Sequence, residues 1–226
     1  HDRRLGLYTF ILRTIAYIVY SFEIPQLRSE GISVSICNNK NSKREFQMLY
    51  YETIEPATLE LLRQLQEVPL LSKTRLVGGT SLALQIGHRK SIDIDLFGEI
   101  DCDQYELVDA LSDFGKLTIL KESKNIHVYQ LNEVKIDIVN YKYPWINPML
   151  IEDNLRLSGM EDIAAMKITA IIGRGTKKDF IDLAFLLDIF SLDEILNFYN
   201  EKYPEASRFM AMKSISYFDD AESDPM

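Results

Sequence analysis

Two aspartates separated by a single residue, Asp93 and Asp95, stand in the stretch SIDIDLF of residues 91–97. Apolar residues alternate with them, so the pattern predicts a strand from Ser91 to Phe97 with both carboxylates on one face. Carboxylates this close repel one another unless cations neutralise them. Mg2+ or Mn2+ binds such oxygens and keeps coordination positions for phosphate and water, so the pair predicts a metal site for phosphoryl transfer.

A third carboxylate on a neighbouring strand would complete such a site. Asp137 lies in the stretch VKIDIVN of residues 134–140, where apolar residues again alternate with polar ones. We therefore expect Asp137 to join Asp93 and Asp95 as a metal ligand. The alternative is that Asp137 is an ordinary solvent-facing acid on an amphipathic strand.

The tetrapeptide Gly78-Gly79-Thr80-Ser81 follows the short apolar stretch Arg75-Leu76-Val77. Glycines allow backbone amides to approach a triphosphate, a helix N-terminus favours an anion, and the two hydroxyls add donors. Thr80 is expected to cap a helix that ends at Gly87. The alternative is a Gly-Gly turn that only connects a strand to a helix.

The C-terminal half supplies cations and further acids. Lys167 and Arg174 are seven residues apart, so they project from nearly the same side of one helix, where they could meet triphosphate or RNA phosphates. Asp179 and Asp182 follow at i,i+3 on the next helix, either as a catalytic base with its partner or as ordinary ion-pair partners. The lysine and arginine could equally form a solvated cationic stripe.

Two residues that precede the paired aspartates have two alternative roles. His88 and Arg89 precede Asp93 in a polar connection. Their side chains could contact phosphate, or they could hydrate a loop.

The elements that position these residues follow from periodicity and turn residues. Strands and helices are expected in an α+β arrangement, a mixed sheet flanked by helices and followed by a helical C-terminal portion. The expected helices cover residues 56–67, 80–87, 105–113, 158–173, 177–189 and 193–201, and the expected strands cover 75–77, 91–97, 116–121, 127–131 and 134–140.

The charge and cysteine content argue against several classes of protein. The net charge of −9 argues against a broad basic surface for nucleic acid, although it leaves room for a small basic groove. The two cysteines, Cys37 and Cys102, have no metal-ligand spacing and suggest no disulfide framework, which favours a reducing, cytoplasmic setting.

Residues 1–47 differ in character from the rest of the chain. Arg13 divides the apolar run of residues 5–24 into pieces too short to span a bilayer, so no membrane anchor is expected. We expect residues 1–47 to be a leader or appended segment, 48–150 the core domain that carries the glycine turn and the three aspartates, and 151–226 a helical portion with an acidic tail. The alternative is an N-terminal helix or strand pair packed on the core.

Three stretches resemble one known family. The run from Val77 to Phe97 is similar to the first motif of the AbiEii/AbiGii nucleotidyltransferase toxin family, within the DNA-polymerase-beta-like superfamily. The stretch KIDIVN of residues 135–140 resembles its second acidic strand, and Lys167 through KDFIDL of residues 178–183 resembles its helical signature. The resemblance covers about Met48 to Leu187.

The resemblance implies transfer of a nucleotide from NTP and a toxin paired with an antitoxin in bacterial phage defence (abortive infection). It implies that Asp93 and Asp95 bind metal, Gly79 and Ser81 hold triphosphate, and Lys167 contacts nucleotide. Asp179 becomes a candidate base. An RNA acceptor such as tRNA follows by analogy with the family.

Two other functions compete with this expectation. One is nucleotide transfer to a small molecule or a protein side chain, which the acidic composition favours slightly. The other is a nucleotide-binding regulator that has lost its chemistry. The retained acids and the basic helix argue against the regulator. The nucleotidyltransferase hypothesis predicts that the glycine turn, the three aspartates and Lys167 converge in space.

Overall fold

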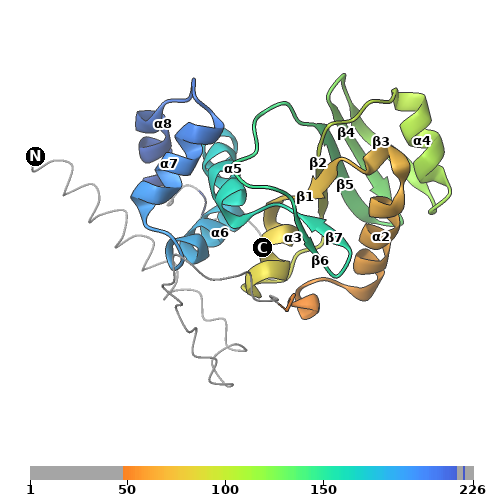
Figure 1. Cartoon of the computed structure of the whole chain (residues 1–226), viewed down its shortest axis with the longest axis horizontal. Coiled ribbons are helices and arrows are strands. Elements are labelled where there is room, and N and C mark those ends of the chain that lie inside the picture. The colour runs from red at the N-terminus through yellow and green to blue at the C-terminus, as the bar shows by residue number, and fades with distance from the viewer. Residues whose placement is uncertain (1–47, 218–220, 222–226) are drawn as a thin grey trace, which may run out of the picture. The chain divides into compact units, whose positions relative to one another are not determined.

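The computed structural model describes residues 48–217 and 221, and the described chain forms two compact units (Figure 1). The core unit comprises residues 48–163 together with Glu201–Tyr203. The helical unit comprises Ala164–Asn200 and the described residues from Pro204 onward. The leader expected over residues 1–47 and most of the expected acidic tail lie outside the described residues.

A mixed sheet of seven strands organises the core unit, in the order β3-β4-β5-β2-β1-β7-β6. The strands are β1 Thr74–Leu76, β2 Ile94–Gly98, β3 Leu117–Glu122, β4 Ile126–Leu131, β5 Val134–Asn140, β6 Leu150–Glu152 and β7 Leu155–Leu157. The pairs β2·β5 and β1·β7 are parallel, and the other neighbours are antiparallel. The fold is therefore α+β, as the sequence predicts.

The helices of the core unit follow the predicted order. They are α2 Pro56–Glu67, α3 Gly78–Ile86 and α4 Gln104–Ser112, with short 3-10 turns at Tyr51–Thr53 and Pro69–Leu71. Pro56 occupies the first turn of α2, where its missing N–H costs no hydrogen bond. Asp103 caps α4 by accepting from the backbone N–H groups of Tyr105 and Glu106.

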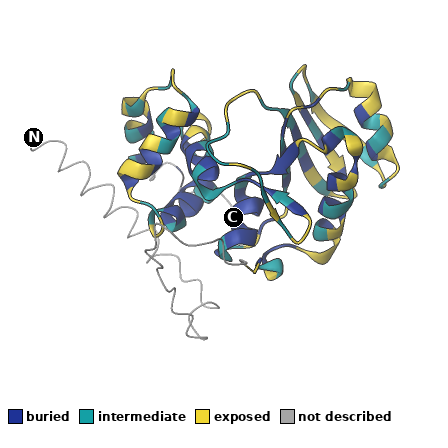
Figure 2. Ribbon diagram, viewed as in Figure 1, coloured by how far each residue is buried: buried dark blue, intermediate teal, exposed yellow. Residues whose placement is uncertain are grey.

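One face of the sheet builds the hydrophobic core. Leu61 and Leu65 of α2, Leu107 of α4, and Ile94 and Ile136 of the central strands belong to one buried cluster. Residues of β2 alternate between buried and half-buried, as the colours of Figure 2 show along the strand. The polar residues of the central strands therefore lie on the face opposite this core.

The helical unit is formed by α-helices whose bounds agree closely with the prediction. They are α5 Met160–Gly173, which begins in the core unit, α6 Lys177–Leu187, α7 Leu192–Lys202 and α8 Arg208–Ile215. Helix α8 and the β6–β7 hairpin were not predicted. Strands of three residues are too short to show alternation, although Asp153 and Asn154, both with positive φ, form the kind of two-residue turn that marks a hairpin.

Two predicted boundaries were wrong. Thr80 does not cap α3, because the helix begins at Gly78 after the extended residue Val77. The strand carrying the aspartates begins at Ile94, and Ile92, expected on its buried face, is 55% exposed. The predicted end of α3 at Gly87 is confirmed, since Gly87 adopts the left-handed conformation that terminates helices.

Candidate active site

The turn between β1 and α3 requires glycine at Gly78. Its φ is +70°, a conformation that side-chain-bearing residues rarely adopt. A Cβ at this position would lie only 2.2 Å from Asp95 Oδ2. The Asp95 carboxylate is therefore in close contact with the Gly78 backbone, and the glycine turn and the acid pair form one local structure.

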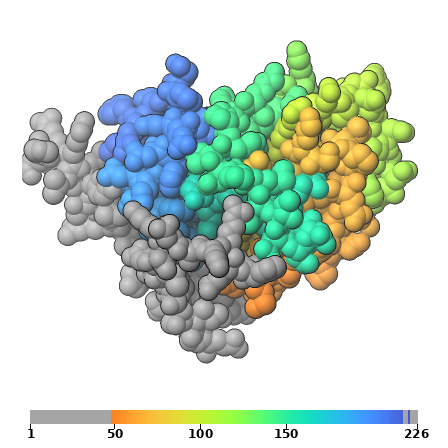
Figure 3. All heavy atoms as spheres, viewed as in Figure 1, coloured from red at the N-terminus to blue at the C-terminus, as the bar shows by residue number. Residues whose placement is uncertain are grey.

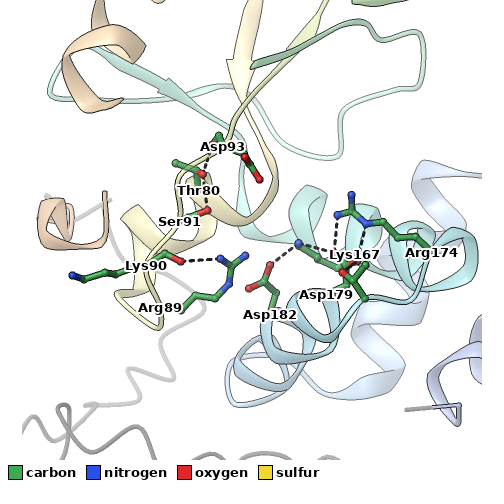
Figure 4. Close-up of polar contacts among 10 residues, drawn as sticks. Thr80, Arg89, Lys90, Ser91, Asp93, Lys167, Arg174, Asp179 and Asp182 are labelled. Carbon is green, nitrogen blue, oxygen red and sulfur yellow. Dashed lines mark hydrogen bonds and ion pairs between the residues drawn. The ribbon is translucent and has the colours of Figure 1, made fainter. Parts of the chain in front are cut away.

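The hydroxyl groups of Thr80 and Ser81 form hydrogen bonds with other residues of the protein. Thr80 Oγ1 donates toward Ser91 Oγ at 2.8 Å and contacts the Asp93 carbonyl (Figure 4). Ser81, fully buried, accepts a hydrogen bond from Gln85 Nε2 at 3.1 Å. Val77 N–H donates to the Asp95 carbonyl at 2.9 Å. Thr80 and Val77 thus fix the backbone of the segment that carries both aspartates.

The acids of the two central strands are neighbours. In the parallel register of β2 and β5, Asp95 is the partner of Asp137, and neighbouring strands lie about 4.8 Å apart. Both side chains are half-buried, on the face opposite the core residues Ile94 and Ile136. Asp93 lies two residues before Asp95, just outside the strand.

Among the described residues, no three His, Cys, Asp or Glu side chains are gathered as a preformed ligand cluster. The reason is visible in the side chains: Asp95 Oδ2 packs toward Gly78, whereas Asp137 Oδ1 lies 2.7 Å from Lys135 Nζ. Asp137 Oδ1 is buried, and beyond this ion pair it has no hydrogen-bond partner in the described structure. Lys135 was not predicted as a site residue, although its position two residues before Asp137 on the same face was visible in the sequence.

This set of oxygens fits a divalent cation. Hard cations take carboxylate oxygens, and here Asp95 and Asp137 share one face of the sheet on neighbouring strands, with Asp93 two residues before Asp95. Asp137 Oδ1 has hydrogen-bonding capacity that the described structure leaves unused. The missing Cβ of Gly78 leaves room for the Asp95 carboxylate itself. Asp93, Asp95 and Asp137 therefore remain the residues that would hold Mg2+ or Mn2+.

The helical unit contains a separate charged cluster around Asp179 (Figure 4). This carboxylate, fully buried, accepts from Lys167 Nζ at 3.1 Å, from Arg174 Nε at 2.8 Å and Nη2 at 3.0 Å, and from Thr176 Oγ1 at 2.7 Å. Lys167 Nζ also lies 2.5 Å from Asp182 Oδ2. The predicted residues Lys167, Arg174 and Asp179 are therefore in direct contact.

This environment does not suit Asp179 to the role of base. Burial alone would raise the pKa of the carboxyl, but hydrogen bonds from Arg174 and Thr176 and the charge of Lys167 lower the pKa to about 2. A base must accept a proton near the working pH, and every donor here stabilises the ionised form. The geometry favours Asp179 as the anion that holds Lys167 and Arg174 in place.

The two cations of this cluster differ in accessibility. The Lys167 side chain is only 6% exposed and lies between two buried acids, whereas the Arg174 side chain is 64% exposed. Arg174 is therefore the one that solvent reaches. Thr176 was not predicted as part of the cluster, because a single hydroxyl at the start of a helix carries no distinctive signal.

The residues before the acid pair have structural partners. His88 is buried, and Arg89 is half-buried and donates to the Lys90 carbonyl at 3.0 Å. A role in phosphate contact stays a prediction for Arg89. In the core unit the structure brings Gly78 into contact with Asp95 and Asp95 into register with Asp137, and in the helical unit it brings Lys167 and Arg174 onto Asp179. The expected convergence of the two groups stays a prediction.

Comparison with known proteins identifies one matching family and a relative of similar length. Residues 60–226 match the sequence model of a family described as "Nucleotidyl transferase AbiEii toxin, Type IV TA system". An uncharacterised protein of Aquifex aeolicus is 32% identical over 171 residues, which cover 73% of this chain and 83% of that protein.

One solved structure supports the fold, and a second is reported for comparison. The antibiotic-resistance factor ANT(2'')-Ia is 12% identical, with a TM-score of 0.50 over 69% of this chain and 96% of that one. MenT4, a nucleotidyltransferase toxin from Mycobacterium tuberculosis, is 13% identical, with a TM-score of 0.46 over 63% of this chain and 62% of that one. No helix among the described residues is long and apolar enough to cross a membrane.

Proposed function

Because the chain belongs to the AbiEii nucleotidyltransferase toxin family, we propose that it transfers a nucleoside monophosphate from an NTP to a hydroxyl of RNA, such as a tRNA. In this reaction the acceptor oxygen attacks the α-phosphorus, the bond between the α-phosphorus and the bridging oxygen breaks, and pyrophosphate leaves. The acceptor proton passes to solvent or to a nearby carboxylate. The reaction would take place in the cytoplasm, where NTPs and RNA are present.

The observation that carries the proposal is the register of Asp95 with Asp137 beside the Gly78 turn. Phosphoryl transfer is catalysed mainly by positioning and by stabilisation of charge, and adjacent carboxylates on one sheet face serve both once a divalent cation is bound. Bound Mg2+ would supply charge neutralisation at the phosphates. Asp93, Asp95 and Asp137 are the residues that would hold it.

The remaining residues of the site have supporting roles in the proposal. The backbone of Gly78 and Gly79 at the start of α3 would approach the triphosphate, because a helix N-terminus favours anions. Thr80 would position the segment around Asp93 through its contact with the Asp93 carbonyl. Ser81 would stabilise the start of α3 through its hydrogen bond with Gln85. Arg174 would contribute positive charge toward substrate phosphates, with Asp179 holding its guanidinium in place.

Asp137 is the better candidate for the base. Its carboxylate carries one ion pair, to the half-exposed Lys135, whereas Asp179 carries four donor contacts. Asp137 Oδ1 therefore keeps hydrogen-bonding capacity with which it could contact an acceptor hydroxyl. Deprotonation of the acceptor by Asp137 is therefore part of the proposal, together with its role as a metal ligand.

The experiment that tests the proposal is incubation of the protein with each labelled NTP, Mg2+ and total RNA or cell lysate. The variant Asp95→Asn removes one carboxylate charge, and Asp109→Asn on the exposed side of α4 is the matched control. Label on RNA with wild type and Asp109→Asn, and none with Asp95→Asn, supports the proposal. Label on protein or small molecules would instead identify a different acceptor, and NTP binding without transfer would indicate a regulator.

A biological role as a toxin follows from the family and is tested separately. Induced expression of the wild-type chain in a bacterial host should arrest growth, and the Asp95→Asn variant should not. Co-expression of a cognate antitoxin should restore growth. Arrest by the Asp95→Asn variant at equal expression would separate toxicity from nucleotide transfer.

A further inference from the structure

A pocket of about 400 Å3 lies in the core unit, where β5 ends, β4 begins and α4 starts. The side chains that line it include Lys124, Lys142, Asn125, Asn140 and His127. The register pairs His127 with the buried Ile138, so His127 lies on the core face of the sheet, opposite Asp137. The pocket is therefore separate from the carboxylates of the candidate active site.

Charge in this pocket is positive, against an overall charge of −9. Lys124 and Lys142 are both exposed, so their ammonium groups reach solvent. Among the described residues that line the pocket, Asp103 is the single acid. Asp103 Oδ1 already accepts from the backbone N–H groups of Tyr105 and Glu106 as the cap of α4. The negative charge of Asp103 is therefore partly offset by these N–H groups, and the two lysines give the pocket a net positive charge.

Buried polar atoms in the lining lack partners in the described structure. His127 is only 7% exposed, and its Nδ1 has no hydrogen bond, with the nearest acid, Glu122, at 3.9 Å. Glu122 instead accepts from the Tyr129 hydroxyl at 2.7 Å. Asn125 Oδ1 is also buried without a hydrogen bond. Unsatisfied buried polar groups are costly, and a bound ligand is one explanation for keeping them.

The amide groups of the pocket are positioned by the backbone. Asn140 N–H donates to the Asn125 carbonyl at 2.9 Å, which joins the two segments at the pocket wall. Asn140 Oδ1 accepts from Ile100 N–H at 3.4 Å. Because the carbonyl oxygen of the Asn140 amide is engaged, its nitrogen remains as the donor end.

We propose that this pocket binds a phosphate-bearing ligand of nucleotide size. Lysine ammonium groups and side-chain amides donate to phosphate oxygens, and Lys124, Lys142 and Asn140 supply such donors here. The volume accommodates a sugar and base as well as the phosphate. The ligand is either a free nucleotide or one nucleotide of an RNA strand. Binding in this pocket does not depend on the transfer reaction at Asp95 and Asp137.

Equilibrium dialysis of the full chain in EDTA tests the proposal without a contribution from a metal site. The probes are AMP, a 5'-phosphorylated tetranucleotide of RNA, and adenosine as the ligand without phosphate. The pocket variant is Lys124→Gln with Lys142→Gln. The control is Lys116→Gln with Lys121→Gln, which removes the same charge from exposed residues that do not line the pocket. In the colours of Figure 3, residues near 100 are yellow-green and those from about 125 to 142 are green.

We expect AMP or the tetranucleotide to bind wild type, with affinity reduced roughly tenfold in the pocket variant and within about twofold of wild type in the control. Adenosine should bind weakly. Binding by AMP but not RNA identifies a free nucleotide, and the reverse identifies a strand. Absence of binding by both probes, or equal binding by the pocket variant, overturns the proposal.

The alkylation rate of Cys102 tests whether the ligand binds in this pocket. Cys102 lines the pocket, so in a Cys37→Ser background its alkylation rate reports occupancy. The ligand should slow alkylation at the concentrations that saturate dialysis. Saturating ligand without protection of Cys102 would place binding elsewhere and contradict the proposal. Asp95→Asn should keep both signals, so a failure of nucleotide transfer and a failure of this pocket are distinguishable.

Discussion

Asp95 in β2 and Asp137 in β5 occupy the same level of two neighbouring parallel strands, on the sheet face that the hydrophobic core leaves open. Forty-two positions of sequence separate them, and the register of the sheet brings their backbones to adjacent positions. Like charges this close destabilise the empty site and favour a bound cation. This relationship carries the proposed chemistry.

Asp137→Asn is expected to lower nucleotide transfer roughly 100-fold or more, because it removes both a cation ligand and the candidate base. The free energy of unfolding should fall by no more than about 1 kcal/mol, since the substitution also removes like-charge repulsion with Asp95. Transfer rates at several Mg2+ concentrations and urea unfolding are the measurements. Wild-type rates in Asp137→Asn would remove this residue from the mechanism.

Gly78→Ala is expected to abolish transfer and to destabilise the core unit by about 1 to 3 kcal/mol, because alanine is strained at this φ. Its Cβ would also displace the Asp95 carboxylate. Thermal unfolding and transfer assays on the same preparation measure both effects.

Gly173→Ala is the matched control for this change. A Cβ at Gly173, the last residue of α5, meets no atom within 4 Å. Alanine has the higher helix propensity, so this variant should be unchanged or more stable by up to about 1 kcal/mol. Equal behaviour of the two alanine variants would show that the contact between Gly78 and Asp95 has no importance.

Asp179 is expected to stabilise the helical unit in a pH-dependent way. Its folded pKa of about 2 lies below the unfolded value of 3.8, so its contribution is present above about pH 4 and is lost as pH falls through about 2. The shift corresponds to about 2 kcal/mol. The difference in unfolding free energy between wild type and Asp179→Asn should therefore shrink between pH 5 and pH 2.

The same variant tests the role of Asp179 in catalysis. If Asp179 positions Lys167 and Arg174, the Asp179→Asn variant should lose activity while its pH profile of kcat/KM between pH 5 and 9 keeps the wild-type shape. Disappearance of an acidic limb from that profile would identify Asp179 as a base. Asp193→Asn, at an exposed ion pair with Arg208, is the control for loss of a charge in the helical unit.

The buried pair of Lys202 and Asp162 is expected to be a strong determinant of stability. Lys202 Nζ lies 2.6 Å from Asp162 Oδ1 and 4.2 Å from the centre of the Trp145 ring, and both charged side chains are fully buried. Asp162→Ala leaves an uncompensated ammonium group and should cost about 3 to 5 kcal/mol. Urea unfolding of purified variants measures this cost.

Glu99→Ala is the matched control for the buried pair. Glu99 pairs with Lys73 at 2.6 Å, but both side chains are more than 60% exposed. An exposed pair of this kind contributes little to stability, because solvent screens both charges. Similar losses in Asp162→Ala and Glu99→Ala would contradict the importance assigned to burial of the pair.

Local patterns in the sequence determined much of this protein. The alternation around Asp95 and Asp137 predicted two strands with acids on one face, and helix periodicity with capping residues predicted α2, α4, α5, α6 and α7. These features were readable because backbone geometry repeats every 2 residues in a strand and every 3.6 in a helix. The family resemblance depended on the same local stretches.

Only the tertiary structure decided which of these elements are neighbours. Periodicity assigns a residue to a face but says nothing about strand order, so the register of Asp95 with Asp137 and the pair of Lys202 with Asp162 could not be predicted. Asp179 was a candidate base from the sequence, but the donors that surround it in the structure favour a role as an anion that positions Lys167 and Arg174. Such outcomes depend on packing between segments far apart in sequence, and the strength of each charge depends on the burial that packing creates.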